Sequence, residues 1–251
     1  MTVIPKDYRP APDLLKDRVI LITGAGDGIG AAAARACAAH GATVILLGRT
    51  TRKLEAVYDS IEQAGHPEPA IYPMNLEGAV AKDFADLALK IDEEFGRLDG
   101  LLHNAANLGT LTPIEHYDPE LWAKVLQVNV NAPYLLTRAC LKLLKQAPDA
   151  RVLFTGAEVG RHGRAYWGAY AASHAAAENI METLADEVES LGRIRVNSID
   201  PGAVRTAMRT RAFPAEDASV LPPPADIMRP YLYLLGPDSR DVHGQRLRAQ
   251  D

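Results

Sequence analysis

The stretch that decides the fold is VILITGAGDGIG, residues 19–30. Its apolar start, Val19–Ile22, has the pattern of a strand buried on both faces, and the alanine-rich segment after Gly30 is typical of a helix. The four glycines between residues 24 and 30 allow a sharp turn and a close approach of the backbone to a ligand. The helix that follows directs its N–H groups and the positive end of its dipole to the same point. We therefore predict a site for the pyrophosphate of a dinucleotide at this turn.

Strand and helix patterns alternate along the rest of the chain. Strands are expected at 19–23, 43–47, 70–73, 100–103, 151–155, 195–199 and 245–247. Helices are expected at 28–40, 51–64, 79–95, 119–146, 165–191 and 225–235, with a kink at Pro133 in the fourth. This alternation predicts a parallel sheet with helices on both faces. With no repeat or linker in view, residues 1–251 are expected to form a single doubly wound α/β domain of the Rossmann type.

The composition narrows the class of protein. The 251 residues carry a net charge of -5, without a basic block for nucleic acid or a polybasic helix for a membrane surface. The first 17 residues contain charged residues and prolines where a signal peptide needs an apolar core, so a signal peptide is not expected here. Cys37 and Cys140 fit no metal or CxxC spacing. We expect a cytoplasmic protein that acts on a small molecule, with no nucleic-acid or membrane partner.

The end of the second strand bears on the identity of the cofactor. An NAD site usually has Asp or Glu near this point to bind the ribose 2′-hydroxyl, whereas Arg49 suits a 2′-phosphate and favours NADP. A solvated surface arginine is the plainer interpretation of Arg49. Asp27 lies in the turn that faces phosphate, where a carboxylate repels the ligand, and it could pair with Arg49. We therefore expect weak or absent NADP binding, with NAD less favoured.

Several ordered motifs together resemble the short-chain dehydrogenase/reductase family over nearly the whole chain, most closely a bacterial cytoplasmic subgroup. These motifs are TGAGDGIG at 23–30, Asn75-Leu76, HNAA at 103–106, Asn129 in VLQVNVN, YAAS at 170–173 and DPGAVRT at 200–206. The resemblance implies a seven-stranded parallel sheet in the order 3-2-1-4-5-6-7. It also implies a substrate flap at 205–224 and a homodimer or homotetramer formed through helices 119–146 and 165–191.

The resemblance further implies which residues contact the cofactor. They are Gly24, Asp27, Gly28, Ile29, Gly30, Arg49, Asn75, Leu76, Asn104, Ala105, Tyr170, Pro201, Gly202, Val204 and Thr206.

The catalytic set of the family is only half present. The family works with Asn, Ser, Tyr and Lys, and Asn129 and Tyr170 fit two of these positions. The serine position, thirteen residues before the tyrosine, is Ala157, and the lysine position is His174. Alanine cannot hydrogen-bond a carbonyl, and an imidazole is not a permanent cation. The resemblance therefore implies an oxidoreductase scaffold with an incomplete catalytic set, which leaves open whether the chain is an enzyme.

The positions at which this chain differs from the family pattern are expected around one cleft. This clustering favours the interpretation that the changes serve a function. In the leading one, hydride transfer is lost or weakened in a pocket repurposed by evolution or rebuilt by engineering. His174 lies one helical turn after Tyr170 and serves as general base or nucleophile. Glu158 and Asp200 follow the fifth and sixth strands, so either carboxylate could support the imidazole.

Other interpretations of the same residues stay open. The chain could still be an NADP-dependent carbonyl reductase or alcohol dehydrogenase that uses Tyr170 and Asn129, or a catalytically silent binding or oligomeric protein. His174, Glu158 and Asp200 could ligate a metal, but one histidine without a spacing motif makes this the weaker idea, and no metal site is expected. The plain alternatives are a packed histidine, a solvent-facing glutamate and an aspartate that caps a turn.

Overall fold

The computed structural model describes residues 4–5 and 7–250 and contains a seven-stranded parallel sheet in the order β3-β2-β1-β4-β5-β6-β7. This confirms the predicted fold class and strand order. The strands are β1 (Val19–Thr23), β2 (Thr43–Gly48), β3 (Ala70–Pro73), β4 (Gly100–His103), β5 (Ala150–Thr155), β6 (Ile194–Asp200) and β7 (Arg246–Arg248). The β1 and β4 residues are buried throughout, as a sheet covered on both faces requires.

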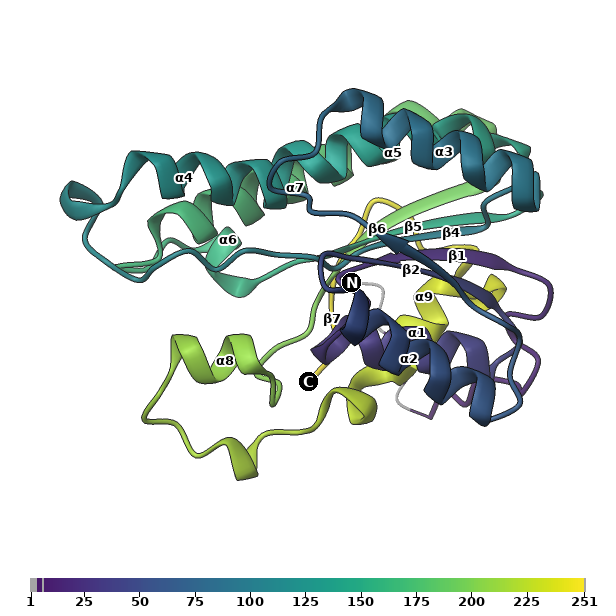
Figure 1. The fold of residues 1–251 in the computed structure, drawn as a ribbon, viewed down its shortest axis with the longest axis horizontal. Coiled ribbons are helices and arrows are strands. Elements are labelled where there is room, and N and C mark those ends of the chain that lie inside the picture. Colours follow the sequence, from purple (N-terminus) through teal and green to yellow (C-terminus); the bar gives the residue numbers. More distant parts are fainter. Residues whose placement is uncertain (1–3, 6, 251) are drawn as a thin grey trace.

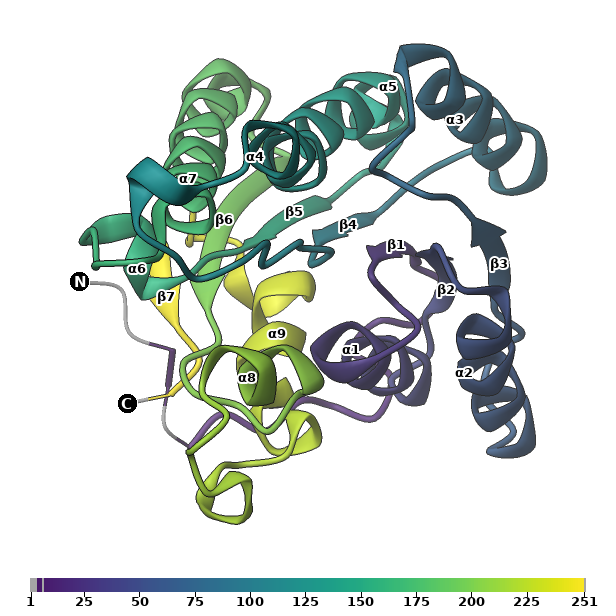
Figure 2. The ribbon, with the colours of Figure 1, turned by 60° about the vertical axis from the view of Figure 1, so that its left-hand side comes forward.

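Helices cover both faces of the sheet (Figures 1 and 2). One face carries α1 (Gly28–Ala39), α2 (Thr51–Gln63) and α9 (Met228–Leu235). The other carries α3 (Ala81–Phe95), α5 (Ala132–Gln146) and α7 (Gly168–Val188). Two separate apolar clusters result, because alternate side chains of each strand point to opposite faces. Among the described residues, no helix is long and apolar enough to cross a membrane.

The long helical region expected at 119–146 is interrupted. Helix α4 (Pro119–Leu126) continues into a π-helical turn at Gln127–Asn131, and α5 follows it. Pro133 lies in the first turn of α5, directly after this π-helical turn, and the kink at Pro133 stays a prediction. The widened turn holds the buried Asn129, and π-turns often occur at functional sites.

The predicted flap contains a helix. No helix was predicted in the segment 205–224, but α8 (Ala207–Ala212) forms there. The Thr206 side chain caps this helix by accepting a hydrogen bond from the Arg209 N–H at 3.1 Å. In Figure 1, α8 stands apart from both helical layers, below the short helix α6 (Glu158–Arg161). This placement puts α8 at the carboxyl edge of the sheet, where the other predicted site residues lie.

Candidate active site

One cleft joins the glycine turn to the predicted catalytic residues. It has a volume of about 790 Å³ and lies at the carboxyl ends of the strands, where open α/β sheets bind ligands. The predicted cofactor residues that line it are Gly24, Asp27, Gly28, Ile29, Arg49, Asn75, Leu76, Asn104, Ala105, Tyr170, Pro201, Gly202, Val204 and Thr206. The predicted catalytic residues that line it are Tyr170, His174, Glu158 and Asp200. Gly30 and Asn129, by contrast, lie behind its wall.

The glycines of the turn have distinct physical tasks. Gly24 and Gly28 have positive φ angles of +68° and +53°, which side chains rarely adopt. A Cβ atom on Gly30 would lie 2.3 Å from the Gly24 carbonyl oxygen, so only glycine lets α1 start this close to β1. Gly30 therefore serves the packing of the turn, while the other glycines leave the cleft open to a ligand.

The charge in the turn is neutralised, although not by the predicted partner. The Asp27 carboxylate accepts a hydrogen bond from the Gly28 N–H at 2.7 Å and pairs with the Lys53 ammonium at 2.5 Å, so the expected pairing with Arg49 is wrong. The first turn of α2 brings Lys53 to the glycine turn, and its hydrogen bond holds the pKa of Asp27 below the usual range. Arg49 lines the cleft, is exposed, and has no acidic partner among the described residues.

Tyr170 presents its hydroxyl group to the cleft with little competition for it. Among the described residues its only hydrogen-bond partner is the Met208 thioether at 3.9 Å, a weak acceptor from α8. Burial raises the pKa of Tyr170 far above its ordinary value, and the negative charge of Asp200 raises it further. The hydroxyl therefore stays protonated at neutral pH and can donate to a ligand oxygen.

His174 is buried against Tyr170 without a hydrogen-bond partner. It is 5% exposed, neither ring nitrogen is bonded, and its ring centroid lies 4.3 Å from that of Tyr170. Gly160 of α6 packs on its backbone, where an added Cβ would lie 2.8 Å from the His174 Cβ. Burial lowers the pKa of His174 to about 4, so the imidazole is neutral at pH 7.

Neither predicted carboxylate supports the imidazole. Glu158 is 72% exposed and lies 3.8 Å from the Arg248 guanidinium, while Asp200 accepts a hydrogen bond from the Gly202 N–H at 2.9 Å. The pairing of His174 with Glu158 or Asp200 is therefore absent, because the first side chain turns to solvent and the second caps the turn after β6. Among the described residues, no group of three or more His, Cys, Asp or Glu could hold a metal.

Asn129 connects three segments behind the cleft. Its amide donates to the Asn107 carbonyl oxygen at 3.0 Å and to the Ser173 hydroxyl at 2.9 Å, and its side-chain oxygen accepts from the Asn107 N–H at 2.7 Å. Ser173 in turn donates to the Tyr170 carbonyl oxygen at 2.8 Å. This network fixes the start of α7, and hence Tyr170, relative to the π-turn.

Ala157, at the serine position of the family, has no hydroxyl group, but two buried hydroxyl groups belong to Thr155 and Tyr231. Ala157 lines the cleft at the start of α6. The Thr155 and Tyr231 hydroxyl groups are buried beside each other, and their contact acts to lower the pKa of Tyr231. Neither hydroxyl has a further partner among the described residues, and Thr155 also lines the cleft.

The sequence reasoning missed an aromatic wall. Trp167 lies between Tyr170 and Phe213, with ring centroids 5.7 and 5.6 Å away. Phe213 follows α8 and carries the Arg209 guanidinium 3.7 Å above its ring, with the Arg164 guanidinium 5.7 Å from the same ring. The wall combines residues about 45 positions apart, so only the fold brings them together.

Comparison with known proteins agrees with the fold and the cleft. Residues 18–217 match the short chain dehydrogenase family, and the chain belongs to this family of oxidoreductases. It is 49% identical over 243 residues to the uncharacterized oxidoreductase YciK of Escherichia coli K12. The aligned region covers 97% of this chain and 96% of that protein.

Solved structures give the same result. A short chain dehydrogenase from Pseudomonas syringae is 55% identical with a TM-score of 0.93, over 97% of this chain and 99% of that one. One from Escherichia coli CFT073, solved in complex with NADPH, is 49% identical with a TM-score of 0.94, over 96% of this chain and all (100%) of that one.

Proposed function

We propose that the protein is a slow, NADPH-dependent carbonyl reductase in which Tyr170 donates the proton to the substrate oxygen. One observation carries the proposal: the protonated Tyr170 hydroxyl lies in the same cleft as the glycine turn, and only a weak thioether acceptor competes for it. The NADPH complex of a 49% identical relative supports the cofactor.

The residues of the cleft suit NADP. The glycine turn accepts a pyrophosphate, and the unpaired Arg49 at the end of β2 suits a 2′-phosphate. Lys53 neutralises Asp27, which removes most of the expected repulsion. Both ring nitrogens of His174 are buried, so the imidazole presents no accessible hydrogen-bonding atom to the ribose hydroxyls.

The bound NADPH supplies the hydride that reduces the carbonyl carbon. Tyr170 gives its proton to the carbonyl oxygen, and its high pKa keeps this proton available throughout the neutral range. At neutral pH the protonated hydroxyl group of Tyr170 is the form that carbonyl reduction uses, whereas alcohol oxidation uses the tyrosinate as base.

The two altered positions explain why the reaction is slow. Ala157 provides no hydrogen bond to orient the carbonyl, and the neutral His174 provides no cation to stabilise the tyrosinate that forms when the proton leaves. A general base centred on His174 is the less favoured alternative, because the imidazole has no carboxylate partner and its pKa of about 4 makes it a weak base.

Consumption of NADPH over a panel of aldehydes and ketones tests the proposal, with Tyr170→Phe as the matched variant. We expect slow turnover by the wild type and a loss of about 100-fold in Tyr170→Phe, the usual contribution of a positioned proton donor. Calorimetry should show that Tyr170→Phe still binds NADPH, so that the loss of turnover is not a loss of the cofactor. Equal turnover in both, or no binding of NADPH, contradicts the proposal.

A further inference from the structure

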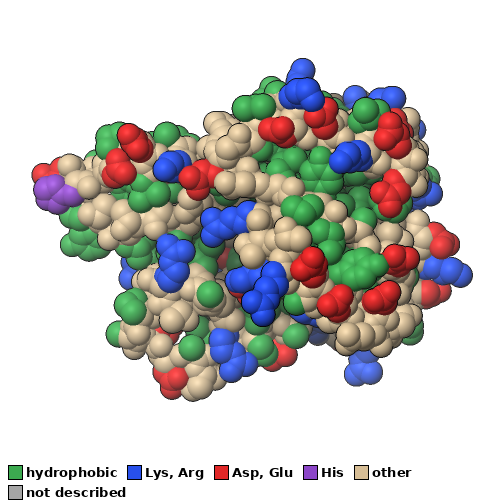
Figure 3. All heavy atoms as spheres, in the orientation of Figure 1, with side chains coloured by type: hydrophobic (Ala, Val, Ile, Leu, Met, Phe, Trp, Pro, Cys, Tyr) green, Lys and Arg blue, Asp and Glu red, His purple; other side chains and the backbone are tan. Residues whose placement is uncertain are grey.

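The mouth of the cleft has unbalanced positive charge at both ends. The cations that line it are Arg49, Lys53, Arg164, Arg209 and Arg211. Lys53 is paired with Asp27, and Arg209 makes two hydrogen bonds of 2.6 Å to the Glu216 carboxylate. Arg49, Arg164 and Arg211 have no acidic partner among the described residues. Basic side chains gather around the hollowed middle of this face in Figure 3.

The carboxylates of the cleft do not offset this charge. Asp27 and Glu158 lie beside cations, at 2.5 Å from Lys53 and 3.8 Å from Arg248. Glu77 lies 3.8 Å from the Lys124 ammonium. Asp200 is buried at the inner end, beside Tyr170. Of the cations that line the cleft away from the glycine turn, Arg164 and Arg211 are therefore left without an acidic partner among the described residues.

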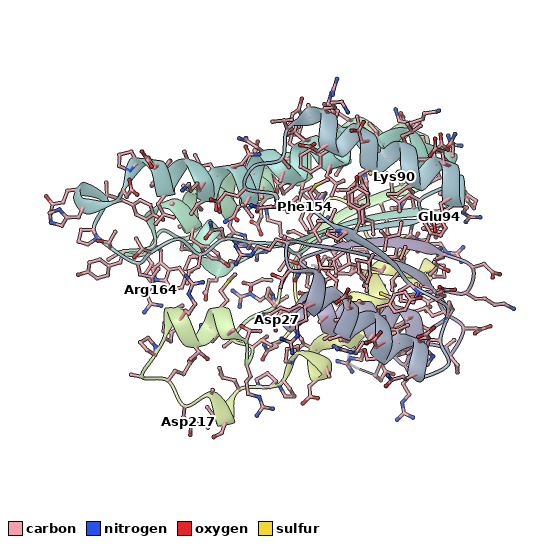
Figure 4. All side chains as sticks on the ribbon, viewed as in Figure 1. Asp27, Lys90, Glu94, Phe154, Arg164 and Asp217 are labelled. Carbon is pink, nitrogen blue, oxygen red and sulfur yellow. The ribbon has the colours of Figure 1, made fainter. Side chains whose placement is uncertain are left out.

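Arg49 and these two arginines belong to different parts of the cleft. Arg49 follows β2 on the glycine-turn side, whereas Arg211 is on α8 and Arg164 is in the loop before α7. Figure 4 shows Arg164 on the side of this loop that faces α8. Its guanidinium contacts the Phe213 ring, which places it at the outer end of the aromatic wall.

The aromatic wall leads from the proton donor toward Arg164. From Tyr170 the rings of Trp167 and Phe213 follow at centroid distances of 5.7 and 5.6 Å. Trp167, in the middle of the wall, lines the cleft and is 9% exposed. A flat apolar body that lies along the wall with its carbonyl at Tyr170 has its far end near Arg164, and Arg211 lines the same cleft from α8.

We propose that the substrate is an aldehyde or ketone with an apolar, planar body and a carboxylate at the end remote from the carbonyl, and that Arg164 and Arg211 bind this carboxylate. The inference rests on the proposed reductase function. It assigns Arg164 and Arg211 to substrate selection and leaves Arg49 to the cofactor.

A matched pair of probes tests the subsite. Formylbiphenyl carboxylic acid, with its aldehyde and carboxylate at opposite ends, is compared with its neutral carboxamide. We expect the wild type to prefer the acid in kcat/KM by about ten-fold, as two partly exposed ion pairs allow, and the preference to shrink at ~0.5 M salt. The variant Arg164→Gln/Arg211→Gln should lose this preference, because its kcat/KM falls about ten-fold more for the acid than for the carboxamide.

Arg193→Gln is the matched control, because Arg193 is exposed and precedes β6 at the opposite edge of the sheet. It should keep the preference for the acid. Equal kcat/KM for both probes in the wild type, or an equal loss for both in the double variant, overturns the inference.

A binding measurement separates this inference from the proposed function. Biphenyl carboxylate and its carboxamide, which lack the aldehyde, are titrated into the NADPH-saturated protein by calorimetry. If no carbonyl is reduced but the carboxylate still binds about ten-fold tighter than the carboxamide in an Arg164- and Arg211-dependent way, the reductase proposal fails and the anion subsite stands. Equal affinities for the two ligands overturn the subsite.

Discussion

His174 should make the folded protein sensitive to mild acid. Its pKa is about 4 in the folded state and 6.5 for a histidine in an unfolded chain, so the unfolded chain binds the proton more readily. The stability it confers is complete above pH 6.5 and is lost as the pH falls toward 4. Between pH 7.5 and 5 we expect this residue alone to cost about 2 kcal/mol of the free energy of unfolding.

Urea unfolding at the two pH values checks this, with His174→Gln as the variant. The buried His103, whose pKa burial lowers to about 3, adds a similar loss in both proteins and cancels in the comparison. The variant should lose about 2 kcal/mol less than the wild type over this range. An identical loss in both proteins means that His174 is not buried as a neutral group.

Restoring the family residues tests the cause of the slow reaction. We expect Ala157→Ser with His174→Lys to raise kcat for carbonyl reduction far more than either change alone, because the carbonyl donor and the cation act as one unit with Tyr170. The added lysine also lowers the pKa of Tyr170, so alcohol oxidation should appear at alkaline pH. Steady-state kinetics of the four proteins give the coupling. Additive effects would show that the two positions do not cooperate.

Arg49, which follows β2, should set the choice of cofactor. Arg49→Gln is expected to weaken NADPH binding about ten-fold and to leave NADH binding unchanged, because only NADPH carries the 2′-phosphate. Calorimetric titration of both cofactors measures the ratio. An equal loss for both would place Arg49 outside the phosphate site.

The sequence predicts the strands and most helices closely, for physical reasons visible in particular segments. The bounds predicted for β1, β3 and β4 are those observed, because each apolar run is short and ends at a turn or a change of polarity. The π-turn at Gln127–Asn131 was missed because it has no signature in hydrophobic periodicity, and α8 because its helix depends on the Thr206 cap.

The sequence predicted which residues line the cleft better than it predicted which side chains contact one another. The sequence placed Tyr170, His174 and the glycine turn in one cleft, because parallel strands bring their carboxyl ends to one edge. It did not predict Lys53 as the partner of Asp27 or the isolation of His174. Such contacts depend on how α2 and α6 pack, which a linear spacing does not determine.

The whole molecule is expected to be a homodimer or homotetramer. Helices α5 and α7 expose Tyr134, which is 51% exposed, and the small residues Ala172 and Ala175, a surface that another copy can approach closely. Light scattering should give two or four times the 27.1 kDa mass of the chain at micromolar concentration. Ala172→Arg should lower this mass, and a monomeric wild type would contradict the expectation.

The most direct test of the whole account follows the hydride itself. The protein is incubated with an accepted aldehyde and NADPH deuterated on the transferred position, and the alcohol is analysed by mass spectrometry. We expect one deuterium at the carbinol carbon in the wild type, with the amount of labelled product reduced about 100-fold in Tyr170→Phe. Absence of labelled alcohol from a protein that binds NADPH would show that the cleft no longer performs hydride transfer.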